Sequence, residues 1–123
     1  MIDVEGVDYI RVPVTDIEEA RRFYGEVLGL PKGPTTHEDW VEFQAGEVTL
    51  AVVTPATHDY DFAPLPVGTI ALRVPDVAEA TAKLEAAGVA VKGTWDSGVC
   101  HTAAFRDPAG NSILLHRRYA PHS

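Results

Sequence analysis

The sequence predicts an α+β protein built from two pseudo-symmetric βαβββ modules. Two segments, residues 43–53 and 105–116, place turn residues between apolar runs, as β-hairpins do. A helical pattern precedes each of them. Matching residues also recur at one constant interval, in the pairs Ile10 and Ile70, Val14 and Val74, and Asp16 and Asp76. The constant interval indicates that the chain is an internal repeat.

The strands and the helix of the first module are predicted from the alternation of apolar and polar residues, from capping residues and from glycines. Residues 7–14 alternate between apolar and polar side chains and read as a strand. Thr15 is expected to begin a helix, because Glu18 follows at the capping-box spacing, and Gly29 ends it. Residues 30–38 contain proline and glycine and are expected to form a loop. Strands are predicted over residues 39–44 and 47–54.

The second module repeats this order. Residues 69–74 read as a strand, and Asp76 is expected to cap a helix that ends at Gly88. Residues 89–91 and 99–105 read as strands that lead into the last hairpin. Four residues suit the turn of this last hairpin. Each of them fixes the backbone angle φ, allows a positive φ, or can form a hydrogen bond with the nearby backbone. They are Asp107, Pro108, Gly110 and Asn111.

The two modules are expected to form one domain over residues 1–123. Module one covers residues 1–54, a connector covers 55–68, module two covers 69–118, and a tail expected to fray covers 119–123. The proline-rich connector is also a candidate flap over a site. One helix covers only one face of a sheet. We therefore expect a cup-like curved mixed sheet with the helices on its outer face.

Composition narrows the class of protein. Hydrophobic residues make up 46% and charged residues 23% of the chain, as in ordinary globular proteins. A formal net charge of −8 argues against nucleic-acid binding, which needs clustered basic residues. The apolar runs are too short for a membrane span, and the first residues do not resemble a signal peptide. With Cys100 as its single cysteine, the protein is expected to be cytoplasmic.

The sequence resembles the vicinal oxygen chelate superfamily, which includes glyoxalases, bleomycin-resistance proteins and extradiol dioxygenases. The resemblance rests on residues 7–30, 70–76, 84–88 and 107–111, in that order and spacing. It implies paired βαβββ modules, a homodimer, and a small-molecule pocket inside the cup.

The resemblance also implies where a metal would bind. Metal-dependent members place a His on each first strand and a Glu or another ligand on each last strand. Tyr9, Thr69, Leu50 and Leu114 stand at these positions. A one-residue shift of register would bring Thr49 or Ile113 instead. A leucine binds no metal and a neutral hydroxyl binds it poorly, so we expect no metal ligands and no cofactor.

Strand alternation selects the candidate ligand-binding residues. If Leu114 faces the cup, alternate residues of the neighbouring strands face it too. Their aromatic, basic and polar side chains suit an aromatic or anionic small molecule. The candidates are Tyr9, Arg11, Trp40, Glu42, Arg73, Thr102, Arg106 and His116.

Each candidate also has a purely structural interpretation. The arginines can pair with nearby carboxylates, and the aromatic residues can simply pack. Cys100 and His101 are neighbours on a strand and should point to opposite faces, which disfavours a catalytic dyad. No catalytic residue is assigned. Displaced metal ligands could come from four histidines, namely His37, His58, His101 and His116.

Three functions stay open at this point. The first is a small-molecule-binding protein that needs no metal. The second is an enzyme of the superfamily, such as a lyase, isomerase or dioxygenase, that uses displaced metal ligands or metal-free acid–base groups. The third is an interaction module whose cup is closed by side chains.

Overall fold

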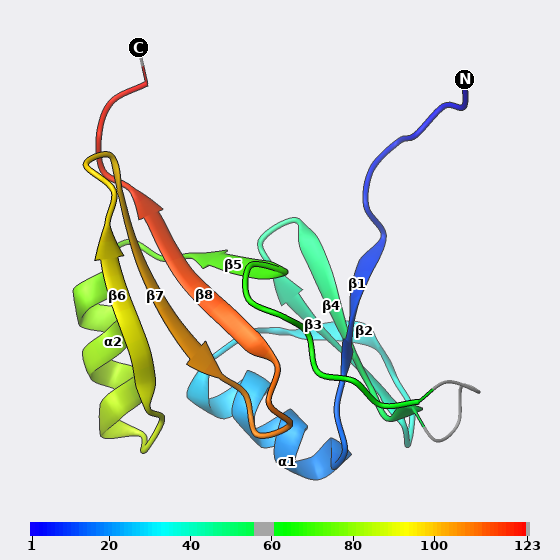
Figure 1. Cartoon of the computed structure of the whole chain (residues 1–123). Coiled ribbons are helices and arrows are strands. Elements are labelled where there is room, and N and C mark those ends of the chain that lie inside the picture. Colours follow the sequence, from blue (N-terminus) through cyan, green and yellow to red (C-terminus); the bar gives the residue numbers. More distant parts are fainter. Residues whose placement is uncertain (56–60, 123) are drawn as a thin grey trace. The chain divides into compact units, whose positions relative to one another are not determined.

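The computed structural model, shown in Figure 1, describes residues 1–55 and 61–122. Its chain divides into two compact units, Met1–Phe62 and Ala63–Ser123. Each unit contains a four-stranded mixed sheet and a helical segment that follows the first strand. The α+β fold with two βαβββ modules is thereby confirmed. Each module forms a sheet of its own.

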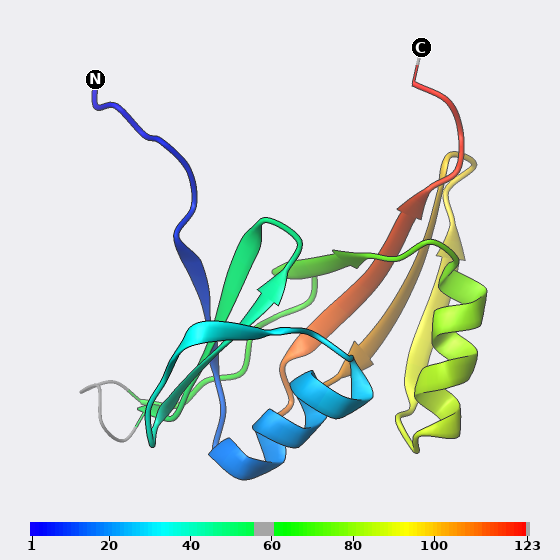
Figure 2. The ribbon, with the colours of Figure 1, turned by 180° about the vertical axis from the view of Figure 1, so that it is seen from behind.

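The first unit has the strand order β1-β4-β3-β2, in which β1 and β4 are parallel and the other neighbours antiparallel. Its helix lies along one face of this sheet (Figure 2). The elements are β1 (Tyr9–Pro13), α1 (Ile17–Arg22), β2 (Lys32–Thr36), β3 (Trp40–Ala45) and β4 (Val48–Val53). A π-helical segment, Phe23–Val27, continues directly from α1.

The helix of the first unit begins one residue later than predicted. Its N-cap is Asp16, whose carboxylate accepts a hydrogen bond of 3.0 Å from the Glu19 amide. The predicted cap, Thr15, lies outside the helix. Asp76 makes the same bond with the Glu79 amide in the second unit, also at 3.0 Å. Capping by aspartate therefore follows the sequence repeat.

The prediction of a loop over residues 30–38 was wrong, because β2 occupies part of it. As an edge strand, β2 needs hydrogen bonds on one side only, so it tolerates Pro34, which cannot donate one. Gly33 allows β2 to approach β3 closely. A Cβ atom built there would lie 2.8 Å from the Cβ of Glu42.

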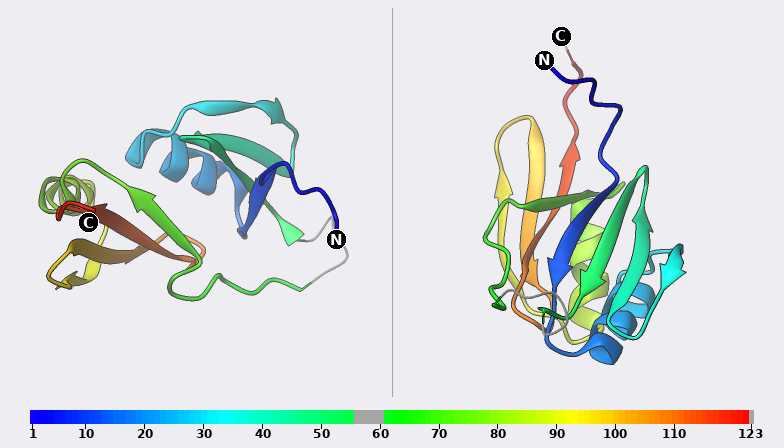
Figure 3. Two further views of the ribbon diagram at one scale, coloured as in Figure 1. Left: turned by 90° about the horizontal axis from the view of Figure 1, so that it is seen from above. Right: turned by 90° about the vertical axis from the view of Figure 1, so that its right-hand side faces the viewer.

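The second unit has the strand order β5-β8-β7-β6, with β5 and β8 parallel. Its helix, seen nearly end-on in the left-hand view of Figure 3, lies to one side of the sheet. The elements are β5 (Ile70–Arg73), α2 (Val77–Ala86), β6 (Val91–Asp96), β7 (Cys100–Arg106) and β8 (Ser112–Arg118).

The strand predicted over residues 89–91 begins only at its last residue. The Val89 amide instead bonds the Leu84 carbonyl and closes the end of α2. From Val91 the strand continues to Asp96, because pairing with β7 extends to His101. The sequence did not predict this extension, because Gly93 interrupts the alternation of apolar and polar residues beyond Val91.

The last hairpin is as predicted, and its turn is buried. Asp107 and Asn111 are 4% and 0% exposed, and they bond each other through the Asn111 side-chain amide at 2.8 Å. Gly110 has φ of 92°, a conformation that favours glycine. The Asn111 side-chain oxygen also accepts a bond of 2.7 Å from the Leu65 amide. The turn therefore holds part of the connector against the second unit.

The core of each unit lies between its helix and one face of its sheet. In the first unit Val12, Val41, Phe43, Leu50 and Val52 are buried on that face. The Tyr24 ring lies 6.0 Å from the Phe43 ring, measured between centroids. The corresponding buried residues of the second unit are Ala103, Phe105, Ile113 and Leu115.

Two further predictions concern the connector and the tail. Residues 56–60 of the predicted connector lie outside the described residues, so the flap stays a prediction. The expectation that the tail frays was wrong at its beginning. The Tyr119 and Ala120 amides both bond the Val99 carbonyl, at 3.0 and 3.2 Å. Within residues 1–55 and 61–122, no helix is long and apolar enough to cross a membrane.

Candidate functional site

Each sheet has a face that its own helix does not cover, which we call the helix-free face of that unit. In the first unit this face carries Tyr9, Arg11, Trp40 and Glu42, as predicted. Strand pairing places Ala51 between Arg11 and Glu42, so these three residues form a cross-strand row. All four candidates from the first half of the chain therefore share one surface.

The aromatic residues of this surface are in contact. The Tyr9 and Trp40 rings meet edge to face, with centroids 5.3 Å apart and an interplanar angle of 79°. The Arg11 guanidinium carbon lies 5.6 Å from the centre of the Trp40 ring. The Trp40 indole N–H donates a 2.8 Å hydrogen bond to the Glu42 carboxylate, which fixes the plane of the indole.

The helix-free face of the second unit carries the other four candidates. Arg73, His116 and Thr102 form a cross-strand row there. Arg106 pairs with Ser112 on the same face, but its guanidinium donates to the Gly110 carbonyl at 3.0 Å. That bond gives Arg106 a structural role at the hairpin turn. The remaining three side chains offer a cation, an imidazole and a hydroxyl.

At the two implied metal positions on the last strands, the side chains carry no donor atom for a divalent ion. Leu114 lies on the helix-free face as predicted, in a row with Ala71 and Ala104. The placement of Leu50 was wrong, because Leu50 pairs with Ile10 and Phe43 on the helix side and is 2% exposed. Ala51 takes the position on the helix-free face, since the first hairpin turn is shorter than the second. Neither the Ala51 nor the Leu114 side chain carries an atom that could bind a metal ion.

The histidines do not assemble a replacement set among the described residues. His101 pairs with Arg117, whereas Cys100 pairs with Arg118, so the two neighbours lie on opposite faces as expected. His58 lies outside the described residues. Within the described part of the chain, no three His, Cys, Asp or Glu side chains group closely enough to hold a metal.

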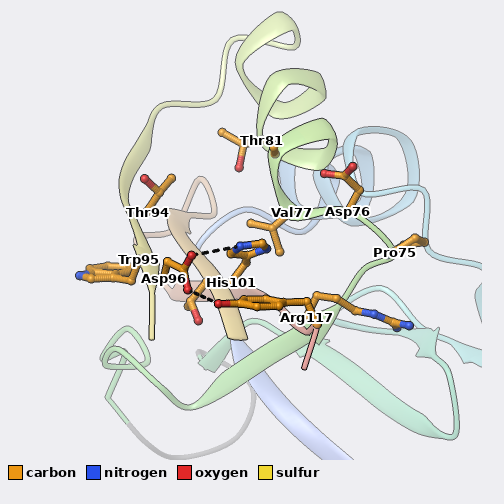
Figure 4. Close-up of a pocket in the computed structure, with 12 residues that line it drawn as sticks. Pro75, Asp76, Val77, Thr81, Thr94, Trp95, Asp96, His101 and Arg117 are labelled. Atoms are coloured by element: carbon orange, nitrogen blue, oxygen red, sulfur yellow. Dashed lines mark hydrogen bonds and ion pairs between the residues drawn. The ribbon is translucent and has the colours of Figure 1, made fainter. Parts of the chain in front are cut away.

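A pocket of about 710 Å³ lies in the second unit, on the helix side of the sheet. Figure 4 shows Val77 and Thr81 of α2 above it, and Asp96 and His101 of the strands below. Tyr119 completes this cluster, and its hydroxyl donates to Asp96 at 2.7 Å. Sequence reasoning missed Asp96 and Tyr119. Only the pairing of β6 with β7, and the position of the tail, bring them to His101.

Hydrogen bonding within this cluster shifts two pKa values in opposite directions. The Tyr119 hydroxyl, and then the Gly98 amide, lower the pKa of Asp96. The same bond raises the pKa of Tyr119. The contribution of Asp96 to stability is complete above its unfolded-state pKa and is lost as the pH falls through its lower folded-state pKa. That of Tyr119 is complete below its unfolded-state pKa and is lost as the pH rises through its higher folded-state pKa.

Replacing Tyr119 with Phe should raise the pKa of Asp96 toward the ordinary value of an aspartate. The replacement removes the donor that contributes most to the lowered pKa and keeps the ring that stacks on His101. The measurement is an NMR titration of the Asp96 carboxyl carbon. Tyr9→Phe, in the other unit, is the control and should leave this pKa unchanged. An unchanged Asp96 pKa in Tyr119→Phe would show that the bond is not formed in solution.

Comparison with known proteins identifies the family of this chain. The model of the Glyoxalase/Bleomycin resistance protein/Dioxygenase superfamily matches residues 6–115. Paired βαβββ modules define the class, and the chain belongs to this superfamily. The comparison with curated proteins gave no match.

Three solved structures illustrate the range of similar proteins. TnmS3, an antibiotic binding protein from Streptomyces sp. CB03234, is 28% identical, with a TM-score of 0.78 over 96% of this chain and 99% of that one. A glyoxalase/bleomycin resistance protein from the same organism is 31% identical, with a TM-score of 0.70 over 91% and 100%. Lactoylglutathione lyase from Agrobacterium tumefaciens is 25% identical, with a TM-score of 0.72 over 92% and 93%.

Proposed function

We propose that this protein binds a planar aromatic, preferably anionic, small molecule on the helix-free face of its first unit. The observation that carries the proposal is the contact between Tyr9, Trp40 and Arg11. Two aromatic rings and one guanidinium meet on a face that the unit's own helix leaves open. Such a surface offers stacking area together with a partner for a carboxylate.

Preorganisation strengthens this interpretation. Because Glu42 accepts the indole N–H of Trp40, the ring is already held in one orientation. Tyr9 is 45% exposed, so a ligand has ring surface to cover. A rigid aromatic surface loses little side-chain entropy on binding, and more of the contact energy then appears as affinity.

One of the similar structures supports small-molecule binding. TnmS3 is described as an antibiotic binding protein. We propose that this chain also acts as a binding protein, and that it does so as a homodimer in the cytoplasm. The proposed binding needs no divalent metal, because Ala51 and Leu114 stand where ligand carboxylates would be required.

Replacing Trp40 with Ala should weaken binding of a planar aromatic anion by about five- to twelvefold. The variant removes the ring that both Tyr9 and Arg11 contact, and one stacking contact of this kind contributes roughly 1–1.5 kcal/mol. The probe is anthraquinone-2-carboxylate, and the measurement is isothermal titration calorimetry with and without a chelator. The affinity should be the same with the chelator present.

The chain supplies its own control in its second tryptophan. Trp95 is also exposed, at 55%, but lies in the second unit. Because Trp95 lines the pocket of the second unit, the two variants are compared at the first unit alone. There Trp95→Ala should leave unchanged the amide chemical-shift changes that the probe causes at Tyr9 and Trp40. Equal losses in the two variants, or no binding by the parent protein, would contradict the proposal. Binding that disappears with the chelator and returns with Zn²⁺ or Mn²⁺ would instead support the enzyme alternative.

A further inference from the structure

The pocket of the second unit arises because α2 covers only part of its sheet. Along β7, Phe105 and Ala103 are 1% and 0% exposed, whereas His101 on the same face is 48% exposed at its side chain. Along β8, Leu115 is buried and Arg117 is exposed. Figure 1 shows β6, β7 and β8 extending beyond the first turn of α2. The bare end of the sheet forms one wall of the pocket, and α2 forms the other.

The acidic groups at this pocket already have partners. The Asp96 carboxylate accepts from the Tyr119 hydroxyl at 2.7 Å and the Gly98 amide at 2.8 Å, and it lies 3.4 Å from His101 Nε2. The Tyr119 ring stacks on His101 with centroids 4.3 Å apart. Asp76 accepts from the Glu79 amide at the start of α2. Their charges are therefore partly neutralised within the fold.

Thr81 and Arg117 are donors at the pocket that remain unused. The Thr81 hydroxyl oxygen is buried and has no hydrogen-bond partner among the described residues. A buried hydroxyl without a partner is costly, and a ligand that bonds it recovers that cost. Arg117 also lines the pocket, and its guanidinium forms no ion pair or hydrogen bond with the described part of the chain.

We propose that this pocket is a second small-molecule site, which takes an organic carboxylate with an apolar or aromatic body. Arg117 binds the carboxylate, the Thr81 hydroxyl bonds a polar group of the ligand, and Val77 with the His101–Tyr119 stack contacts its body. A volume of about 710 Å³ lies within the usual range of ligand pockets, about 300–1,000 Å³. The net charge of −8 does not prevent this, because exposed charges beyond about 8 Å are screened at physiological salt.

This site is independent of the one proposed on the first unit. All its lining residues belong to the second unit, and apart from Trp95 and Thr102 the lining residues on the strands lie on the helix side of the sheet. A chemical probe can therefore be followed at the two places separately, residue by residue.

The test uses phenylacetate as the probe and amide chemical shifts of the full chain as the readout. We expect shifts at His101, Arg117 and Tyr119. Arg117→Gln should weaken the affinity about tenfold, because a charge-assisted hydrogen bond is lost. Arg118→Gln is the matched control. Arg118 directly follows Arg117 in the chain and lies on the opposite face of the sheet. Its guanidinium donates to the Pro121 carbonyl at 3.2 Å. It should keep the parent affinity, and so should Trp40→Ala.

Two further comparisons sharpen the outcome. Thr81→Val keeps the shape of the side chain and removes the hydroxyl. It should weaken the affinity for 4-hydroxyphenylacetate, which carries a second polar group, by about threefold, and it should bind phenylacetate like the parent protein. Phenylacetamide should bind at least about tenfold more weakly than phenylacetate. The proposal is overturned if the shifts appear only on the helix-free faces, if Arg117→Gln and Arg118→Gln behave alike, or if the amide binds as well as the acid.

Discussion

Replacing Leu50 with Glu is expected to unfold the protein, although the resemblance to metal-dependent relatives suggests a carboxylate at this position. Leu50 is 2% exposed and pairs with Ile10 and Phe43 on the face that the first helix covers. An ionised carboxylate there has no partner. Burying it costs about 5 kcal/mol or more, which is comparable with the whole stability of a typical domain. Chemical denaturation followed by circular dichroism measures this loss.

The matched control is Leu114→Glu, at the corresponding position of the second unit. Leu114 lies on the helix-free face, half-buried between Ala71 and Ala104. A glutamate there can reach solvent, so we expect a loss of about 1 kcal/mol. If Leu50→Glu were as stable as Leu114→Glu, the register of β4 described above would be incorrect. Binding of a divalent ion by Leu50→Glu would lead to the same conclusion.

Replacing Asp107 with Ala should destabilise the protein by about 3 kcal/mol. The Asp107 carboxylate accepts from the Ala109 and Asn111 amides at 2.9 and 2.8 Å, and from the Asn111 side chain at 2.8 Å. Asn111 is fully buried, so removal of the carboxylate takes away an acceptor for its backbone and side-chain amides at a place that solvent does not reach. Thermal and urea unfolding measure the effect.

Asp16→Ala serves as the comparison for this variant. Asp16 also accepts from a backbone amide, at 3.0 Å, but at an exposed helix N-terminus where water can replace it. Its loss should cost only about 1 kcal/mol. Similar destabilisation by the two variants would mean that burial of the hairpin turn contributes nothing beyond the hydrogen bonds themselves.

Local chemistry was enough to predict the repeat, the helices and the hairpins. Asp76, Gly110 and Asn111 act within a few residues of their own position, through capping, positive φ and side-chain bonds to nearby backbone. Strand alternation also placed Trp40 and His116 correctly, because side chains on a regular strand change face at every residue. For the same reason, separation of Cys100 from His101 could be predicted without knowing the fold.

Pairing between distant strands decided the rest. Residues 32–36 can form a strand despite Pro34 because this strand lies at the edge of its sheet. No local feature of the sequence indicates which strand will be at an edge. The length of the first hairpin turn sets whether Leu50 or Ala51 faces the helix, and a shift of one residue reverses the answer. Asp96, His101 and Tyr119 are separated along the chain, so only the folded second unit brings them together. The sequence by itself determined the modules and their local elements, whereas the tertiary structure decided register, edges and the pocket, because these depend on contacts between residues far apart in the chain.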